Sequence, residues 1–161
     1  MKDIKLNDND CAFKYRVNGI IINDNKVLTV QIMDNGFYCL PGGHVKLKEL
    51  SSDAIKREMK EEVGACCNDT KLIAVLENLF LRSDKKFVQE LSFYYLIDAS
   101  NVNLNDYVTY EEDDFLKKLE FKWLDINNLE KYNFKPQVIV DQIKNIKNGD
   151  TNLKYYSIRE K

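Results

Sequence analysis

The 161-residue sequence contains no long hydrophobic run. No stretch approaches the roughly 18 apolar residues of a membrane-spanning helix. The first ten residues, MKDIKLNDND, lack the apolar segment of a secretion signal. Acidic and basic side chains are nearly balanced, with 26 against 24 and a formal net charge of −2. These absences give no reason to expect a membrane or a nucleic-acid polymer as a partner, and we expect a cytoplasmic protein.

The cysteine patterns typical of zinc sites and disulfide scaffolds are also missing. The four cysteines, Cys11, Cys39, Cys66 and Cys67, form no CxxC pair, and two of them are adjacent. We therefore expect neither a zinc site nor a disulfide framework, and four reduced thiols are the simplest interpretation.

The hydrophobic pattern predicts a single α/β domain over residues 1–161, without internal repeats or linkers. Residues 104–119 are less regular, with a short helix expected around 111–118. Residues 1–12 and 151–161 are expected to be loosely held. The predicted strands cover residues 14–22 and 26–33 as a hairpin, 37–40, 71–81, 87–97 and 120–124, and the predicted helices cover 51–63 and 136–147.

The helix predicted over residues 51–63 has two distinct faces. Ser51 or Ser52 is expected to cap its start, and Gly64 is expected to end it. Its apolar stripe consists of Ile55, Met59 and Val63, spaced four residues apart. A second face, about 100° away around the helix, carries Glu58, Glu61 and Glu62.

The three glutamates repel one another by a few tenths of a kcal/mol per pair on such a face. A group of carboxylates on a rigid helix suits a hard divalent cation such as Mg²⁺, which prefers oxygen ligands. The alternative is an ordinary solvated helix face, because glutamate is a good helix former. Residues 57–62 alone favour this alternative, and the surrounding sequence decides against it.

The segment around these glutamates resembles the Nudix box. Residues 43–65 read GHVKLKELSSDAIKREMKEEVGA, which follows the pattern of G, five residues, E, seven residues, RE, an apolar residue, any residue, EE, any residue, G and an apolar residue. A chance match at one start position has a probability of about 10⁻⁸ to 10⁻⁹. The fixed letters are Gly43, Glu49, Arg57, Glu58, Glu61, Glu62 and Gly64, and the apolar slots hold Met59 and Ala65.

The resemblance extends to FYCLPGGHV before the box and to EFKWLDINNL late in the chain. Lys48 and Leu50 depart from the residues that many members have, namely glycine and serine or threonine. Neither position is fixed in the pattern, so only the local loop geometry is affected.

The resemblance implies a Nudix-like α/β/α sandwich with a mixed β-sheet between helices. It implies hydrolysis of a nucleoside diphosphate linked to another group, with Mg²⁺, or alternatively Mn²⁺, as the cofactor. Glu58, Glu61, Glu62 and the Gly43 carbonyl would hold the metal. The catalytic residues would be Glu58 and Glu61, together with Arg57 and Glu49, which would form a positioning salt bridge.

The implied partner is a nucleotide-type small molecule: a nucleoside triphosphate, which the short chain slightly favours, or ADP-ribose, a sugar nucleotide or a dinucleoside polyphosphate. The substrate-binding candidates are Arg16, Gly42, Gly43, His44 and Glu90. Each charged candidate has a simpler interpretation: an outward-facing charge for Arg16, a loop filler for His44 and a solvated carboxylate for Glu90.

Several questions remain open from the sequence. The general base could be a box glutamate or one of the weaker candidates, which are Glu77, Glu90, Glu111 and Glu112. Aromatic residues such as Phe37 and Phe80 could stack on a base, although core packing is the more common role. A non-catalytic nucleotide sensor on the same fold and a plain interaction domain are the alternative functions. A homodimer is also possible.

Overall fold

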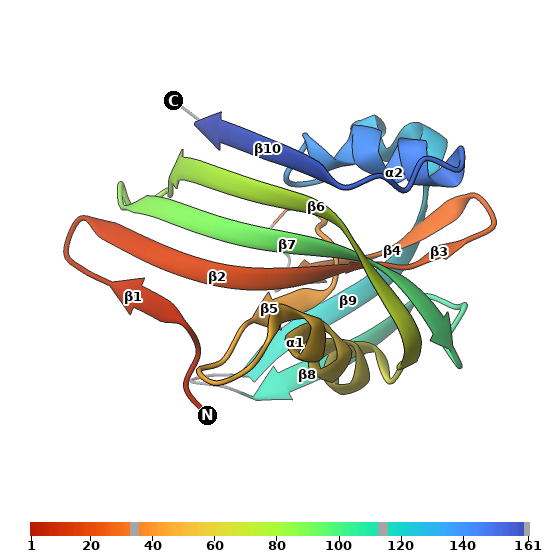
Figure 1. Cartoon of the computed structure of the whole chain (residues 1–161), viewed down its shortest axis with the longest axis horizontal. Coiled ribbons are helices and arrows are strands. Elements are labelled where there is room, and N and C mark those ends of the chain that lie inside the picture. The colour runs from red at the N-terminus through yellow and green to blue at the C-terminus, as the bar shows by residue number, and fades with distance from the viewer. Residues whose placement is uncertain (33–35, 113–115, 160–161) are drawn as a thin grey trace.

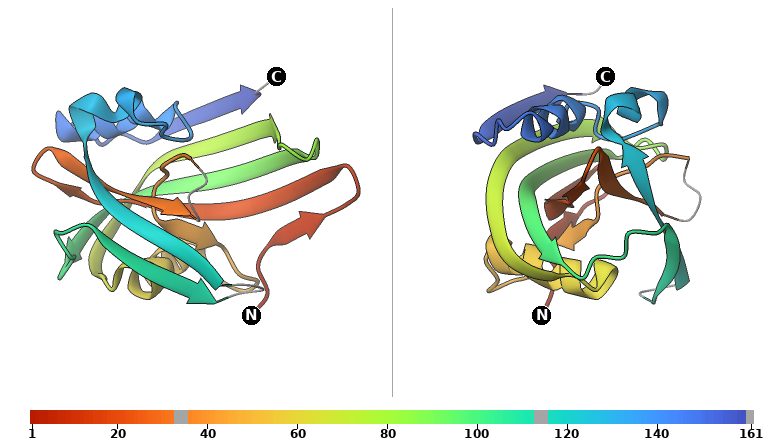
Figure 2. Two further views of the ribbon diagram at one scale, coloured as in Figure 1. Left: turned by 180° about the vertical axis from the view of Figure 1, so that it is seen from behind. Right: turned by 90° about the vertical axis from the view of Figure 1, so that its right-hand side faces the viewer.

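The computed structural model describes residues 1–32, 36–112 and 116–159. In this part of the chain, ten strands form two sheets, with helical segments packed against them (Figures 1 and 2). The strands are β1 (Lys5–Asn7), β2 (Cys11–Ile20), β3 (Ile22–Asn23), β4 (Lys26–Ile32), β5 (Gly42–His44), β6 (Cys66–Leu81), β7 (Phe87–Ser100), β8 (Tyr107–Glu112), β9 (Leu116–Asp125) and β10 (Lys154–Arg159). The helical segments are α1 (Ser51–Glu58), the π-helical turn η1 (Met59–Val63), the 3-10 turn η2 (Ile126–Lys131) and α2 (Ile139–Lys147).

The larger sheet is mixed, as predicted. Its strand order is β1-β2-β7-β6-β10, and β5 pairs with β2 outside this path. Strands β2 and β7 are parallel, as are β6 and β10, whereas β6 and β7 form a long antiparallel hairpin. The smaller sheet is antiparallel, in the order β3-β4-β9-β8. The α/β sandwich class is therefore confirmed, with the strands divided between two sheets.

The larger sheet separates two hydrophobic cores. Successive residues of a strand face opposite sides, so Val17 packs in the core with α1 while Ile20 packs in the core with α2. Helix α1 and helix α2 lie on opposite sides of this sheet (Figures 1 and 2). The apolar stripe predicted for residues 51–63 is confirmed across α1 and η1, because Ile55 and Met59 are fully buried and Val63 is buried.

Two predictions about local structure were wrong. The short helix expected around residues 111–118 is absent from the described part of that segment, where β8 and β9 pair as antiparallel strands; residues 113–115 lie outside the described residues. Cross-strand pairing decides this conformation, and the Tyr107 ring stacks on Phe121 at a centroid distance of 4.6 Å. The helix cap is Leu50, without a side-chain hydrogen bond, and neither serine caps the helix.

The chain ends are also more regular than predicted. Strand β1 pairs antiparallel with β2, and β10 pairs with β6. Strand β1 is short and polar and carries little strand signal of its own, whereas Tyr155, Tyr156 and Ile158 of β10 are strand formers, a signal that the prediction missed. None of the helices in the described residues is long and apolar enough to cross a membrane.

Candidate active site

The glutamate-bearing segment changes helix type within the Nudix-like motif. Regular α-helix ends at Glu58, and a π-helical turn, η1, follows before Gly64 adopts φ +67°. The Ala65 amide donates to the Met59 carbonyl at 3.1 Å and closes this turn. π-Helical turns are frequent at functional sites because they shift the side chains that follow them. Here the turn carries Glu61 and Glu62.

Arg57 lies at the centre of the carboxylate cluster. Its Nε and Nη2 donate to the two oxygens of Glu49 at 2.8 and 2.9 Å. Its Nη1 donates to Glu58 at 2.5 Å and to Glu61 at 3.1 Å, and Nη2 also donates to the His44 carbonyl at 3.0 Å. Hydrogen bonds from Arg57 lower the pKa of Glu49. One guanidinium is shared among several carboxylates, so the cluster keeps an excess of negative charge.

Glu58 is buried against the turn at Gly43. A Cβ atom on Gly43 would lie 2.4 Å from both carboxylate oxygens of Glu58, so the absence of a side chain is what allows this approach. Burial raises the pKa of Glu58, and the hydrogen bond from Arg57 opposes that shift. Glu58 is therefore a carboxylate held in one place by its surroundings.

Gly42 connects Glu62, on the turn η1, to Arg16, on strand β2 of the larger sheet. Its amide donates to Glu62 Oε2 at 2.9 Å, and its carbonyl accepts from Arg16 Nη2 at 3.2 Å. A Cβ atom there would lie 2.1 Å from the Val17 carbonyl oxygen, and φ is +151°, so the position favours glycine. One residue thus holds Glu62 on one side and Arg16 on the other.

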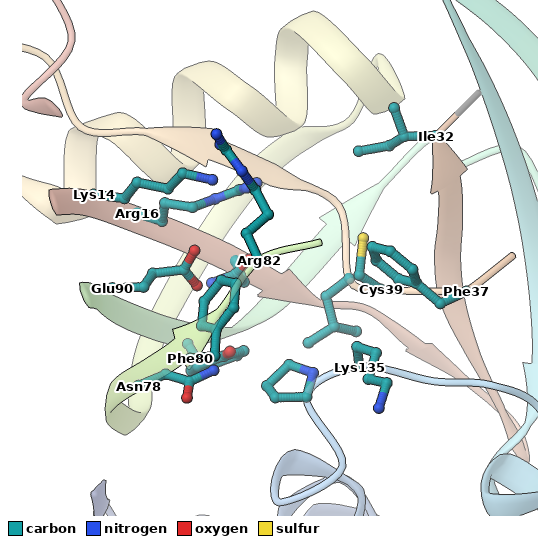
Figure 3. Close-up of a pocket in the computed structure, with 14 residues that line it drawn as sticks. Lys14, Arg16, Ile32, Phe37, Cys39, Asn78, Phe80, Arg82, Glu90 and Lys135 are labelled. Carbon is teal, nitrogen blue, oxygen red and sulfur yellow. The ribbon is translucent and has the colours of Figure 1, made fainter. Parts of the chain in front are cut away.

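A cavity of 440 Å³ opens beside this connection (Figure 3). Four cationic side chains and one carboxylate line it, together with apolar and amide side chains. The lining residues are Lys14, Arg16, Asn18, Ile32, Phe37, Cys39, Leu40, Asn78, Phe80, Arg82, Glu90, Tyr94, Lys135 and Pro136. The excess of positive charge favours an anionic ligand in this cavity.

Charges inside the cavity are coupled. Burial and the neighbouring Arg16 lower the pKa of Lys14. Burial alone would lower the pKa of Arg16, but the Glu90 carboxylate and other negative groups outweigh it and the pKa is raised. Glu90 accepts a hydrogen bond from the Ser92 hydroxyl at 2.7 Å, which fixes one of its oxygens.

The structure brings the predicted site residues together in two groups. Glu49, Arg57, Glu58 and Glu61 form the Arg57 cluster, and Arg16 and Glu90 line the cavity with Gly42 and Glu62 between the groups.

The remaining candidates lie elsewhere or outside the described part of the chain. The His44 side chain does not line the cavity, and its Nδ1 is 3.8 Å from Asp3. Burial and Arg16 lower its pKa to about 4, so it is neutral at pH 7. Glu77 is exposed and accepts from the Tyr155 hydroxyl. The side chains of Glu111 and Glu112 lie outside the described part of the structure.

Sequence reasoning missed several residues of the cavity wall. Asn18, Asn78, Arg82 and Lys135 were not among the candidates, and Phe37 and Phe80 were interpreted mainly as core. The available signal was weak: Asn18 is a polar residue in the otherwise apolar stretch VNGIII.

The donor groups suit a hard cation. Glu58, Glu61 and Glu62 offer oxygen atoms, and the Gly43 position keeps Glu58 close to the backbone turn. Within the described residues, no three acidic, histidine or cysteine side chains converge closely enough to hold a metal ion among themselves. Mg²⁺ typically takes one or two carboxylates and completes its shell with waters and substrate phosphates.

Comparisons with known proteins agree with this geometry. A family model described as "NUDIX domain" matches residues 12–142. An ADP-ribose pyrophosphatase of Methanocaldococcus jannaschii is 32% identical over 136 residues, which cover 83% of this chain and 74% of that protein. An 8-oxo-dGTP diphosphatase of Buchnera aphidicola is 28% identical over 121 residues, covering 72% and 80%. A MutT protein structure from Bacillus halodurans has the same fold, with a TM-score of 0.69, 16% identity and coverage of 91% and 89%.

Proposed function

Since this chain belongs to the Nudix family, we propose that it is a Mg²⁺-dependent pyrophosphohydrolase of small nucleoside diphosphate derivatives. The observation that carries this proposal is the link through Gly42. The Gly42 amide lies 2.9 Å from Glu62 Oε2, and the Gly42 carbonyl lies 3.2 Å from Arg16 Nη2. The turn that carries Glu61 and Glu62 therefore adjoins the cationic cavity. A substrate with phosphates at one end and a nucleoside at the other suits both parts.

Glu58, Glu61, Glu62 and the Gly43 carbonyl would hold the divalent cation. When bound, such an ion offsets negative charge on the phosphate oxygens and makes a bound water more acidic. Arg57 would keep Glu58 and Glu61 in position through its hydrogen bonds, and Glu49 would anchor Arg57. Arg16, held by the Gly42 carbonyl, would face the phosphates from the cavity side.

The reaction is a hydrolytic substitution at phosphorus. The oxygen of the attacking water forms a bond to phosphorus, and the bond from that phosphorus to the bridging oxygen breaks. Glu61 is our candidate to accept the proton of the water, because it is the most exposed of the three glutamates. The half that keeps the bridging oxygen leaves with the electron pair of the broken bond: a phosphate or pyrophosphate from a nucleoside triphosphate, and a nucleotide or a sugar phosphate from the other substrate types.

The substrate proposals are ADP-ribose, a nucleoside triphosphate, a sugar nucleotide or a dinucleoside polyphosphate. The relatives named ADP-ribose pyrophosphatase and 8-oxo-dGTP diphosphatase support the first two. The homodimer stays an untested prediction.

A substrate panel tests the proposal. The purified protein is incubated with each substrate type in Mg²⁺, in Mn²⁺ or in chelator, and the released nucleotide and phosphate products are quantified. We expect the protein to hydrolyse at least one substrate only in the presence of the cation. We expect this turnover to fall by orders of magnitude in Glu61→Gln. Absence of cation-dependent hydrolysis with every substrate type, from a folded protein, would overturn the proposed function.

A further inference from the structure

Three polar atoms in the cavity wall are buried without a hydrogen-bond partner. They are Arg16 Nε, Asn18 Nδ2 and Asn78 Oδ1. The two asparagines are only 8% and 7% exposed. Leaving such a group unpaired in a folded protein costs about 1–3 kcal/mol. Three such groups around one cavity indicate that a ligand supplies the missing partners.

The fold places these groups on one face of the larger sheet. Arg16 and Asn18 are two residues apart on β2, so their side chains point to the same side. On β7, Glu90 and Tyr94 are the register partners of Lys14 and Asn18 respectively, and Asn78 of β6 pairs with Glu90. Asn18 and Asn78 therefore stand at different levels along the sheet. A ligand that meets both must extend along the cavity.

The chemistry of the three atoms restricts the ligand. Arg16 Nε and Asn18 Nδ2 are donors and need acceptors, whereas Asn78 Oδ1 is an acceptor and needs an N–H or O–H group. Ionised phosphate oxygens satisfy the donors but offer nothing to Asn78 Oδ1. The ligand must therefore carry donor groups as well as acceptors, and hydrogen phosphate, which has an O–H donor, is too small to meet atoms at both levels of the sheet.

The apolar part of the wall points to a planar group. Phe80 follows Asn78 by two residues on β6, so both side chains lie on the cavity side of the sheet (Figure 3). Phe37, Leu40 and Pro136 add further apolar surface. A nucleobase combines a flat apolar face with an edge of donors and acceptors, and aromatic side chains stack well on such faces.

We propose that Asn18 and Asn78, with Arg16 Nε, are specificity determinants that hydrogen-bond the nucleoside half of the substrate. The inference rests on the proposed function for the identity of the substrate. Arg16 Nη2 is fixed to the Gly42 carbonyl of β5, so the phosphates lie at the β5 side of β2, and the nucleoside extends from β2 across β7 toward β6. The base lies toward Phe80 and Asn78. A site with buried polar groups discriminates strongly, because a ligand without matching groups leaves them unpaired.

Binding of the nucleotide product tests this inference separately from catalysis. Titration calorimetry compares the four nucleoside 5′-monophosphates with ribose 5-phosphate, which has the sugar and phosphate but no base. We expect the wild-type protein to bind at least one nucleoside monophosphate at least ten-fold more tightly than ribose 5-phosphate. Asn18→Leu and Asn78→Leu should each weaken that binding by about 10- to 100-fold and leave ribose 5-phosphate nearly unchanged.

A matched control is available on the same sheet. Gln89→Leu also replaces an amide with an aliphatic group, but Gln89 is exposed and does not line the cavity, so binding should match the wild type. Thermal unfolding shows whether each variant is folded. Where a leucine variant does not fold, Asn18→Asp, which loses the donor, and Asn78→Ser, which retracts the acceptor, replace it with the same expected result.

Two results would overturn the inference. One is equal affinity of the wild-type protein for ribose 5-phosphate and for all four nucleoside monophosphates. The other is an equal loss of affinity for both ligand types, or no loss, in the asparagine variants. Tight, Asn-dependent nucleotide binding without turnover of any substrate would overturn the proposed function and support this inference, so the two failures are distinguishable.

Discussion

Arg57 binds the carboxylate of Glu49 through two parallel hydrogen bonds, from Nε at 2.8 Å and from Nη2 at 2.9 Å. The same guanidinium also reaches Glu58 and Glu61, so its planar fork fixes three carboxylates at once. Lysine has the charge but cannot form this set of bonds. The geometry of the carboxylate helix should therefore depend on arginine itself.

Arg57→Lys should lower the free energy of unfolding by about 1–3 kcal/mol, because buried acceptors lose their partners. Turnover should fall by about ten-fold or more, since small displacements of catalytic groups are costly. Chemical denaturation and steady-state kinetics measure the two effects. Arg82→Lys is the control for stability: Arg82 pairs with Asp84 at an exposed site and should leave the free energy of unfolding nearly unchanged. Equal losses of stability in both variants would contradict this prediction.

Gly43→Ala should displace the Glu58 carboxylate, because the added Cβ would lie 2.4 Å from its oxygens. We expect turnover to fall by about 100-fold in steady-state assays, as a displacement of about 1 Å can cause. Gly149→Ala is the control. That glycine has φ +91° but no neighbour within 4 Å of the added atom, so the variant should lose about 1–2 kcal/mol of stability and keep its turnover. Normal turnover in Gly43→Ala would show that Glu58 need not occupy its observed position.

Glu61→Gln should separate activity from stability. The Glu61 side chain is 55% exposed, so the free energy of unfolding should change by less than about 0.5 kcal/mol while turnover falls by orders of magnitude. Ile55→Ala is the opposite case: its side chain is fully buried, and the cavity should cost about 2–5 kcal/mol. Denaturation midpoints and turnover of the folded fraction measure both. A Glu61→Gln protein as unstable as Ile55→Ala would assign Glu61 a structural role.

The helical segment over residues 51–63, which carries the three glutamates, was predictable because its signals are local. The four-residue spacing of Ile55 and Met59 fixes the buried side, and the glutamate spacing fixes the acid face. The π-helical turn at Met59–Val63 was not predictable, since regular helix spacing describes those residues equally well. Local signals therefore give the ligand set without its final geometry.

The cavity was harder to predict because it joins distant parts of the chain. Asn18 and Asn78 are 60 positions apart, and only the pairing of β2 and β6 with β7 puts them on one wall. The short helix expected around residues 111–118 failed for a related reason. In the described part of that segment, the end of β8 pairs with the start of β9, whereas the charged local sequence alone suggested a helix.

Cys39 should resist alkylation. It lines the cavity, and burial raises the pKa of its thiol to about 11, with Arg16 opposing the shift. Only the thiolate reacts quickly, so at pH 8 Cys39 should be modified about 100-fold more slowly than a thiol with an ordinary pKa. Cys11 and Cys66 are exposed and serve as internal controls in the same sample. Mass spectrometry of iodoacetamide-treated peptides measures the rates, and labelling of Cys39 as fast as Cys11 would contradict the prediction.

Mg²⁺ should stabilise the folded protein, because binding relieves repulsion among the carboxylates around Arg57. At a concentration of about 100 times the dissociation constant, the expected gain is about 2.7 kcal/mol, or several degrees in melting temperature. Thermal unfolding with Mg²⁺, with chelator and with KCl at matched ionic strength separates this effect from salt screening. The double variant Glu58→Gln/Glu61→Gln should lose the Mg²⁺-dependent shift and keep any response to KCl. If the wild-type and double-variant proteins gain equally from Mg²⁺, the cation binds elsewhere and these glutamates are not its ligands.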